Sequence, residues 1–187
     1  VQPDAGEVKI GETIRIGYFA QEVPDMDTNQ RVIDYIRDVA EYIPTRDGKI
    51  SATMMLERFL FDSAMQYAPI AKLSGGEKRR LYLLKVLMEA PNVLLLDEPG
   101  NDLDIPTMTI LEDYLDSFSG IVIAVSHDRY FLDNIVDRIF AFEGNGHLTQ
   151  YEGGYTDYTE ALARKGGAVS EGQSTAVGAE KKKSAQA

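Results

Sequence analysis

Apolar and polar positions follow two different periods in the first part of the chain. Residues 7–10 and 13–19 are short runs in which β-branched residues alternate with polar ones. This alternation predicts a hairpin or two successive strands. From residue 25 to residue 68 the apolar positions recur every three or four residues, which predicts helices. The apolar face of the first helix consists of Val32, Ile33, Ile36, Val39, Ala40 and Ile43.

Polar residues and proline mark the expected ends of these helices. The residues that can delimit the first helix are Asp27, Thr28 or Asn29 at its start and Pro44 at its end. A turn follows at residues 45–49, and Ser51 then caps a second helix. The pattern therefore predicts a small helical subdomain, at about residues 25–90, inserted between strands.

The next helix begins at the motif Ser74-Gly75-Gly76-Glu77. Its spacing fits a capping box, in which Ser74 caps the helix and Glu77 reaches back to the backbone of the cap. The two glycines leave backbone amides bare at the positive end of the helix, where an anion can approach. By itself the motif is equally compatible with a well-capped helix that has no further role. The buried face of this helix is predicted to contain Leu81, Leu84, Val86, Leu87 and Met88.

Two continuous apolar runs, residues 93–96 and 121–125, are typical of parallel strands that are covered on both faces. Asp97 and Glu98 end the first run, and His127 closely follows the second. Open α/β sheets bind ligands at the carboxyl ends of their strands, so these side chains form a candidate site. One carboxylate can hold Mg²⁺ while the other orients or deprotonates a water molecule. The alternative is a solvated turn beside a structural or merely exposed histidine.

The remaining segments continue the α/β pattern. Pro106 opens a further helix, residues 138–142 form a strand that turns at residues 144–146, and residues 155–165 form an amphipathic helix. From residue 166 onward small and polar residues dominate. This composition predicts a flexible linker at residues 166–187, after one folded domain at residues 1–165.

The composition limits the functions that the chain can have. Its net charge of −11 argues against nonspecific binding to nucleic acid or to anionic membranes by the chain as a whole. The absence of cysteine excludes disulfides and thiolate metal sites, and it is compatible with a cytoplasmic location. No apolar run approaches the ~20 residues that a membrane span needs. The phosphate-binding loop G-x-x-x-x-G-K-[ST] is also absent, so the chain has no evident phosphate cradle of its own.

Five motifs, in this order, resemble those of the ATP-binding-cassette (ABC) ATPases. They are a Q-loop at residues 18–22, a signature motif at 73–77, a Walker B strand at 94–99, a D-loop at 101–104 and a switch histidine at 126–128. The resemblance covers about Gly6 to Tyr158 and implies an incomplete P-loop NTPase-like α/β domain with a mostly parallel sheet. It also implies that a Walker A portion precedes Val1, so we expect this fragment to be inactive by itself. Gly100 departs from the threonine that is usual in the family.

The resemblance assigns roles to individual residues, with ATP and Mg²⁺ as cofactors. Asp97 would hold Mg²⁺, and Glu98 would polarise the attacking water. Gln21 would sense the metal and the γ-phosphate, which His127 would also contact. The residues that would complete an ATP site across the interface with another cassette, and couple the two sites, are Ser74, Gly75, Gly76, Glu77 and Asp104.

Residues 126–133 and 142–158 are similar to the second cassette of the ABC-F subfamily. These are tandem-cassette ATPases without membrane spans that act on the ribosome in translation. The resemblance implies a cytoplasmic protein whose partners are a second cassette, in the same full-length chain, and the ribosome with its RNA. Two alternatives stay open. One is the nucleotide-binding subunit of an ABC membrane transporter, and the other is a non-enzymatic cassette that binds a partner without turnover.

Overall fold

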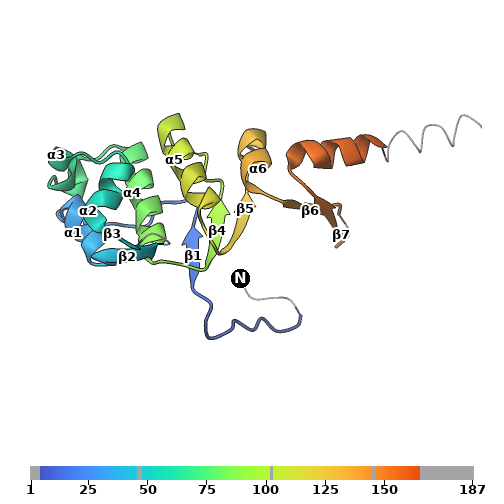
Figure 1. Ribbon diagram of the computed structural model, residues 1–187, viewed down its shortest axis with the longest axis horizontal. Coiled ribbons are helices and arrows are strands. Elements are labelled where there is room, and N and C mark those ends of the chain that lie inside the picture. Colours follow the sequence, from blue (N-terminus) through green and yellow to red (C-terminus); the bar gives the residue numbers. More distant parts are fainter. Residues whose placement is uncertain (1–4, 46–47, 102, 145, 165–187) are drawn as a thin grey trace, which may run out of the picture. The chain divides into compact units, whose positions relative to one another are not determined.

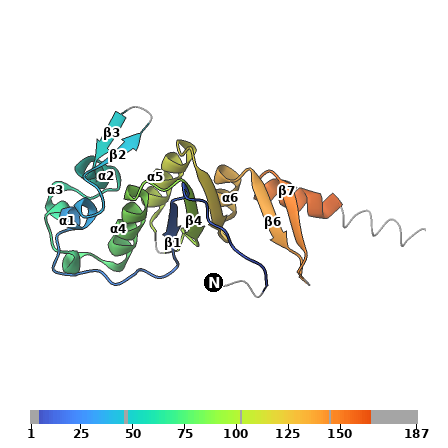
Figure 2. The same cartoon turned by 90° about the horizontal axis from the view of Figure 1, so that it is seen from below.

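The computed structural model of the chain describes residues 5–45, 48–101, 103–144 and 146–164 (Figures 1 and 2). The chain divides into two compact units, Val1–His127 and Asp128–Ala187. The linker that the sequence predicts at residues 166–187 lies outside the described residues.

The first unit contains a three-stranded parallel sheet. Its strands are β1 (Ile16–Phe19), β4 (Val93–Asp97) and β5 (Ile121–Val125), in the order β1-β4-β5. β4 therefore lies in the middle, with Ile16 opposite Val93 on one side and Ile121 opposite Val93 on the other. The predicted parallel pairing of the two apolar runs is confirmed, and their carboxyl ends meet at one edge of the sheet.

The sheet does not include residues 7–10, which we predicted to be a strand. Val8 and Ile10 are 69% and 63% exposed, and the part of the chain that the structure describes contains no strand before β1. Alternating β-branched residues favour extended backbone, but a strand also needs a hydrogen-bonding partner. The hairpin prediction was therefore wrong, and only the end of the second run, at β1, forms a strand.

The burial of the two apolar runs also differs from the prediction. In β4, Leu94 and Leu96 are buried, as expected. In β5 the side chains alternate, and Ile121 and Ile123 remain 61% and 54% exposed. A continuous apolar run cannot reveal whether both faces are covered, because that depends on which other segments pack there. Within the described residues of this unit, one face of the sheet is covered and the other is not.

Short elements between β1 and β4 form the mainly helical part of the first unit (Figure 2). They are α1 (Val32–Arg37), β2 (Tyr42–Thr45), β3 (Gly48–Ser51), α2 (Ala52–Arg58), α3 (Ser63–Gln66), η1 (Ile70–Lys72) and α4 (Gly75–Met88). Their core is made by aromatic and aliphatic side chains that are fully buried: Ile33, Ile36, Met55, Leu56, Phe59, Phe61, Leu81 and Leu84.

The first helix of this part is shorter than its apolar pattern suggests. α1 begins after Arg31, which makes no side-chain capping bond, so none of the three predicted caps is used. Ile43 is buried, but it belongs to β2, which pairs with β3 in an antiparallel hairpin. An apolar residue at this position fits both a helical and an extended pattern, and the pairing of β2 with β3 decides between them. The Ser51 cap of α2 is confirmed, since its hydroxyl accepts a hydrogen bond from the Met54 amide at 3.2 Å.

The last helix of the first unit is α5 (Ile105–Asp116), with Asp104 as its N-cap and Pro106 in its first turn. The second unit contains α6 (Arg129–Ile135), β6 (Arg138–Phe142), β7 (Leu148–Glu152) and a helix at residues 155–164. β6 and β7 form the predicted antiparallel hairpin. Asp133 fixes the last helix within this unit, because its carboxylate accepts hydrogen bonds from the amide and the hydroxyl of Thr156, both at 2.7 Å.

Candidate functional site

The predicted capping box at the start of α4 is present. The Glu77 amide donates to the Ser74 hydroxyl at 3.3 Å, and the Ser74 amide donates to a Glu77 carboxylate oxygen at 2.7 Å. The Ser74 hydroxyl donates to the same carboxylate oxygen at 2.8 Å. These bonds, the one from the backbone first, hold the pKa of Glu77 below its ordinary range. Glu77 is therefore an anion that closes the first turn of the helix.

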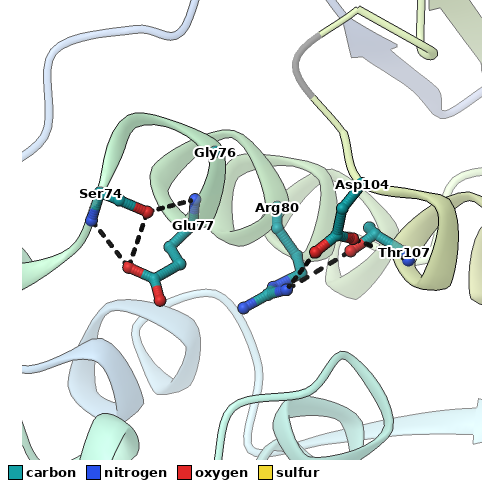
Figure 3. Close-up of a pocket in the computed structure, with 6 residues that line it drawn as sticks. All are labelled: Ser74, Gly76, Glu77, Arg80, Asp104 and Thr107. Carbon is teal, nitrogen blue, oxygen red and sulfur yellow. Dashed lines mark hydrogen bonds and ion pairs between the residues drawn. The ribbon is translucent and has the colours of Figure 1, made fainter.

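The same helix start forms one wall of a cleft of about 300 Å³ (Figure 3). The cleft is lined by Ser74, Gly76, Glu77, Arg80, Asp104 and Thr107. It brings the first turns of α4 and α5 together, although almost thirty residues separate them in sequence. The structure thus places Asp104 beside the glycine motif, a proximity that the sequence does not reveal.

Arg80 and Thr107 are cleft residues that the sequence analysis missed. The Arg80 side chain is 9% exposed, and its Nη1 lies 3.5 Å from both the Asp104 carboxylate and the Thr107 hydroxyl. Its guanidinium also lies 4.9 Å from the centre of the Phe61 ring, a cation–π contact. The only signal in the sequence was a basic residue next to the apolar positions of a helix, which more often indicates a solvated side chain.

At the other wall of the cleft, Asp104 both caps α5 and forms an ion pair with Arg80. Its carboxylate caps α5 by accepting a hydrogen bond from the Thr107 amide at 2.9 Å. The hydrogen bonds from the Thr107 hydroxyl and amide, helped by the charge of Arg80, lower the pKa of Asp104. The side chain is still 57% exposed, so this anion remains accessible from the cleft.

The two adjacent carboxylates at the end of β4 point to different partners. Asp97 accepts a hydrogen bond from the Tyr18 hydroxyl of β1 at 3.2 Å. Partial burial and this bond raise the pKa of Tyr18. Glu98 lies on the β5 side, where its carboxylate accepts a hydrogen bond from the His127 amide at 3.3 Å and lies 3.4 Å from His127 Nε2. The like charges are therefore separated, each with its own donor.

Glu98 has an unusual backbone conformation. Its φ is +47°, in the left-handed region that residues other than glycine rarely adopt. Its amide nevertheless continues the ladder between β4 and β5 by donating to the Val125 carbonyl at 2.8 Å. The Glu98 side chain is 13% exposed, whereas the His127 side chain is 96% exposed. The turn thus holds a nearly buried carboxylate in place next to a histidine that reaches solvent, and such strained positions cluster at functional sites.

Gln21 follows the end of β1, and its side chain is exposed. Its carbonyl accepts a hydrogen bond from Arg79 Nη1 of α4 at 2.6 Å. Among the described residues, no three acidic, histidine or cysteine side chains converge on one point as a preformed metal site. This donor set still fits Mg²⁺ that arrives with a nucleotide, because such an ion takes one or two carboxylates and completes its shell with phosphate oxygens and water.

Comparison with known proteins identifies the class to which this fold and these motifs belong. The profile of the ABC transporter family matches residues 2–101, just over half of the chain. The chain therefore belongs to this family and has the fold of its ATPase domain, with a parallel sheet and flanking helices. Within the described residues, no helix combines the length and hydrophobicity that a membrane span requires.

Individual relatives are similar over most of the chain. It is 58% identical over 164 residues to the uncharacterized ABC transporter ATP-binding protein YfmR of Bacillus subtilis, which covers 87% of this chain and 26% of that protein. It is 38% identical over 159 residues to the energy-dependent translational throttle protein EttA of Haemophilus influenzae, which covers 85% of this chain and 29% of EttA. The chain thus spans between a quarter and a third of these relatives.

A solved structure supports the same fold. The archaeal ribosome recycling factor, crystallised with the archaeal ribosomal stalk protein, superimposes with a TM-score of 0.66 at 20% identity. The match covers 88% of this chain and 32% of that chain. At this level of identity the similarity shows the fold alone.

Proposed function

We propose that this chain forms part of an ATP-hydrolysing cassette in a larger tandem-cassette protein of the ABC-F subfamily. The observation that carries the proposal is the Glu98–His127 pair at the carboxyl ends of β4 and β5, 3.4 Å apart. A nearly buried carboxylate beside an exposed imidazole suits a water molecule that attacks a phosphate. The proposed limits are residues 1–165 for the cassette portion, with a helical subdomain at about 25–90, and 166–187 for a linker.

The residues at this sheet edge have separate roles in the proposed reaction. Glu98 orients the attacking water and accepts its proton, while His127 contacts the γ-phosphate. Asp97 and Gln21, on the β1 side of the end of β4, would provide oxygen ligands for Mg²⁺. Mg²⁺ held there would supply positive charge that offsets the charge of the phosphates. The different partners of Asp97 and Glu98 support this division of labour.

The cleft between α4 and α5 serves the opposite site in this proposal. Ser74 and the amides of Gly75 and Gly76 face the γ-phosphate of a nucleotide that a second cassette holds. Glu77 contributes indirectly, because its carboxylate is engaged by Ser74 in the capping box. Asp104, which remains accessible, couples the two sites. ATP then joins the two cassettes, and hydrolysis releases them.

We place the action of the full-length protein on the ribosome, in the cytoplasm. The support is the 38% identity with a protein whose name describes a translational throttle, together with the ABC-F resemblance of residues 126–133. The transporter alternative shares the same catalytic motifs, so it differs from this proposal only in the partner and not in the chemistry.

The experiment uses Glu98→Gln in the full-length protein. The amide keeps the size of the side chain but cannot accept the proton of water, so ATP binding should persist while kcat falls by at least about 100-fold. The ATP-bound variant should then accumulate in the ribosome fraction on co-sedimentation. Glu89→Gln, at an exposed glutamate beyond the end of α4, is the matched control and should behave as wild type.

Two results would contradict the proposal in different ways. Hydrolysis at the wild-type rate in Glu98→Gln would place the catalytic base elsewhere. Loss of hydrolysis without any ATP-dependent ribosome binding would retain the ATPase assignment and favour the transporter alternative.

A further inference from the structure

Two side chains of α4 contact the segment that leaves β1. Arg79 and Tyr82 are three positions apart, so they lie on the same face of the helix. Between them they contact four consecutive residues, 18–21, which end in Gln21. The same helix begins at the Ser74-Gly75-Gly76 motif, about 7.5 Å from Arg79 along the helix axis at 1.5 Å per residue.

Arg79 makes the closest of these contacts. Its side chain is buried, with 1% of the residue exposed. One nitrogen, Nη1, donates to the carbonyls of both Ala20 and Gln21, each at 2.6 Å. The guanidinium also lies 4.1 Å from the centre of the Phe19 ring. Charge-assisted hydrogen bonds to two successive carbonyls fix the direction of the backbone and not merely its distance from the helix.

Tyr82 holds the preceding part of the same segment. Its hydroxyl donates to the Tyr18 carbonyl at 3.0 Å and accepts a bond from the Ala20 amide at 3.5 Å. Its ring lies 5.2 Å from the Phe19 ring, centre to centre. Because Tyr18 also donates to Asp97, the segment is anchored to β4 on one side and to α4 on the other.

We propose that Arg79 is a positioning residue, which fixes the backbone of Gln21 to α4 so that the exposed Gln21 side chain is held toward the nucleotide. This inference rests on the proposed function, since it assumes that Gln21 acts on bound Mg-ATP. Through Arg79, the residue that senses nucleotide in one site is tied to the helix whose first turn completes the opposite site. The two sites then respond together to a movement of α4.

The geometry requires arginine at this position. A planar guanidinium can present two hydrogens from one nitrogen to two carbonyls while its face lies against an aromatic ring. A lysine ammonium carries the same charge but has no planar face, and its flexible stem does not fix the direction of its donors. Arg79→Lys should therefore give only partial function, whereas a role in charge alone would leave it fully active.

The test is a double-mutant cycle on ATP hydrolysis by the full-length protein. Arg79→Met removes the donors but keeps an unbranched apolar chain. It should lower kcat by about 10- to 100-fold, the loss expected for a misplacement of about 1 Å, with little change in KM for ATP. In a Gln21→Ala background, Arg79→Met should change kcat by less than about twofold, because a positioning residue has no effect once its target is absent.

Lys78→Met is the matched control, since it removes a positive charge from the preceding position of α4, and it should retain the wild-type kcat. Arg79→Lys should give an intermediate kcat, and it replaces Arg79→Met in the cycle if the methionine variant does not fold. If the separate reductions in kcat caused by Arg79→Met and Gln21→Ala multiply in the double mutant, the role of Arg79 is purely structural and the inference is overturned. A wild-type kcat in either Arg79→Met or Gln21→Ala would overturn it as well, while the proposed function is judged separately by Glu98→Gln.

Discussion

Gly75→Asp separates the two roles of the α4 start, as a helix cap and as a phosphate-binding turn. Gly75 is the first residue of α4, and a Cβ atom built on it meets nothing within 4 Å. Replacing glycine removes up to about 1 kcal/mol of backbone entropy cost, although aspartate recovers only part of that gain. A carboxylate at the positive end of the helix adds about 0.3–1 kcal/mol of stabilisation. We therefore expect the melting temperature to change by no more than about 4 °C.

The effect on nucleotide should be much larger. A carboxylate about 4 Å from a phosphate oxygen costs about 4 kcal/mol per pair of unit charges at an effective dielectric constant of 20. That energy corresponds to a loss of affinity of about 1,000-fold. Gly75→Asn is the control, because it has the same shape without the charge, and any loss it shows measures blocked approach of the backbone alone.

The assays are a melting curve and ATP-dependent co-sedimentation with ribosomes, both on full-length protein in the Glu98→Gln background. The expected result is a near-normal melting temperature with no ATP-dependent binding. Retained binding in Gly75→Asp would show that the motif only caps a helix. A large fall in melting temperature would show that the open space beside Gly75 is not available to a side chain.

The remaining predictions concern stability. Glu77 and Asp104 have lowered pKa values, so the stability they contribute is present above their ordinary values of 4.5 and 3.8 and is lost as the pH falls through the folded-state values. As the pH is lowered from 5 to 3, the urea concentration at half-unfolding should therefore decrease more steeply in wild type than in a Glu77→Gln/Asp104→Asn variant. An equal decrease in both proteins would show that these carboxylates do not link stability to pH. Gly17→Ala should cost about 1–3 kcal/mol, because its Cβ would lie 2.9 Å from Pro91 and 3.0 Å from Val86. Gly100→Ala, whose Cβ meets nothing within 4 Å, should stay within about 0.5 kcal/mol in the same denaturation assay, and equal effects of the two substitutions would contradict the packing argument.

Some features of this protein follow from the sequence because they depend on neighbouring residues. The capping box needs only Ser74 and Glu77 at a spacing of three, and the caps at Ser51 and Asp104 follow the same local rule. β4 could be predicted because its aliphatic run, residues 93–96, is bounded by Pro91 and Pro99 and is therefore too short for a buried helix. The candidate site residues come from motifs whose spacing along the chain is itself the signal.

Tertiary structure alone decides how segments distant in sequence meet. Asp97 and Glu98 are adjacent, yet their partners come from β1 and β5, and only the order of strands in the sheet separates the two carboxylates. Arg79 and Arg80 are adjacent too, yet their side chains have different partners. Arg79 contacts residues 18–21, of which Gln21 is the nearest in sequence at 58 positions. Arg80 contacts Asp104, which is 24 positions away. Local propensity predicted a strand at residues 7–10, but no described strand pairs with that segment. It also predicted a longer first helix, and there the pairing of β2 with β3 overrode it. Hydrogen bonds and packing between such segments depend on which surfaces the folded chain brings together, and single-sequence periodicity does not contain that information.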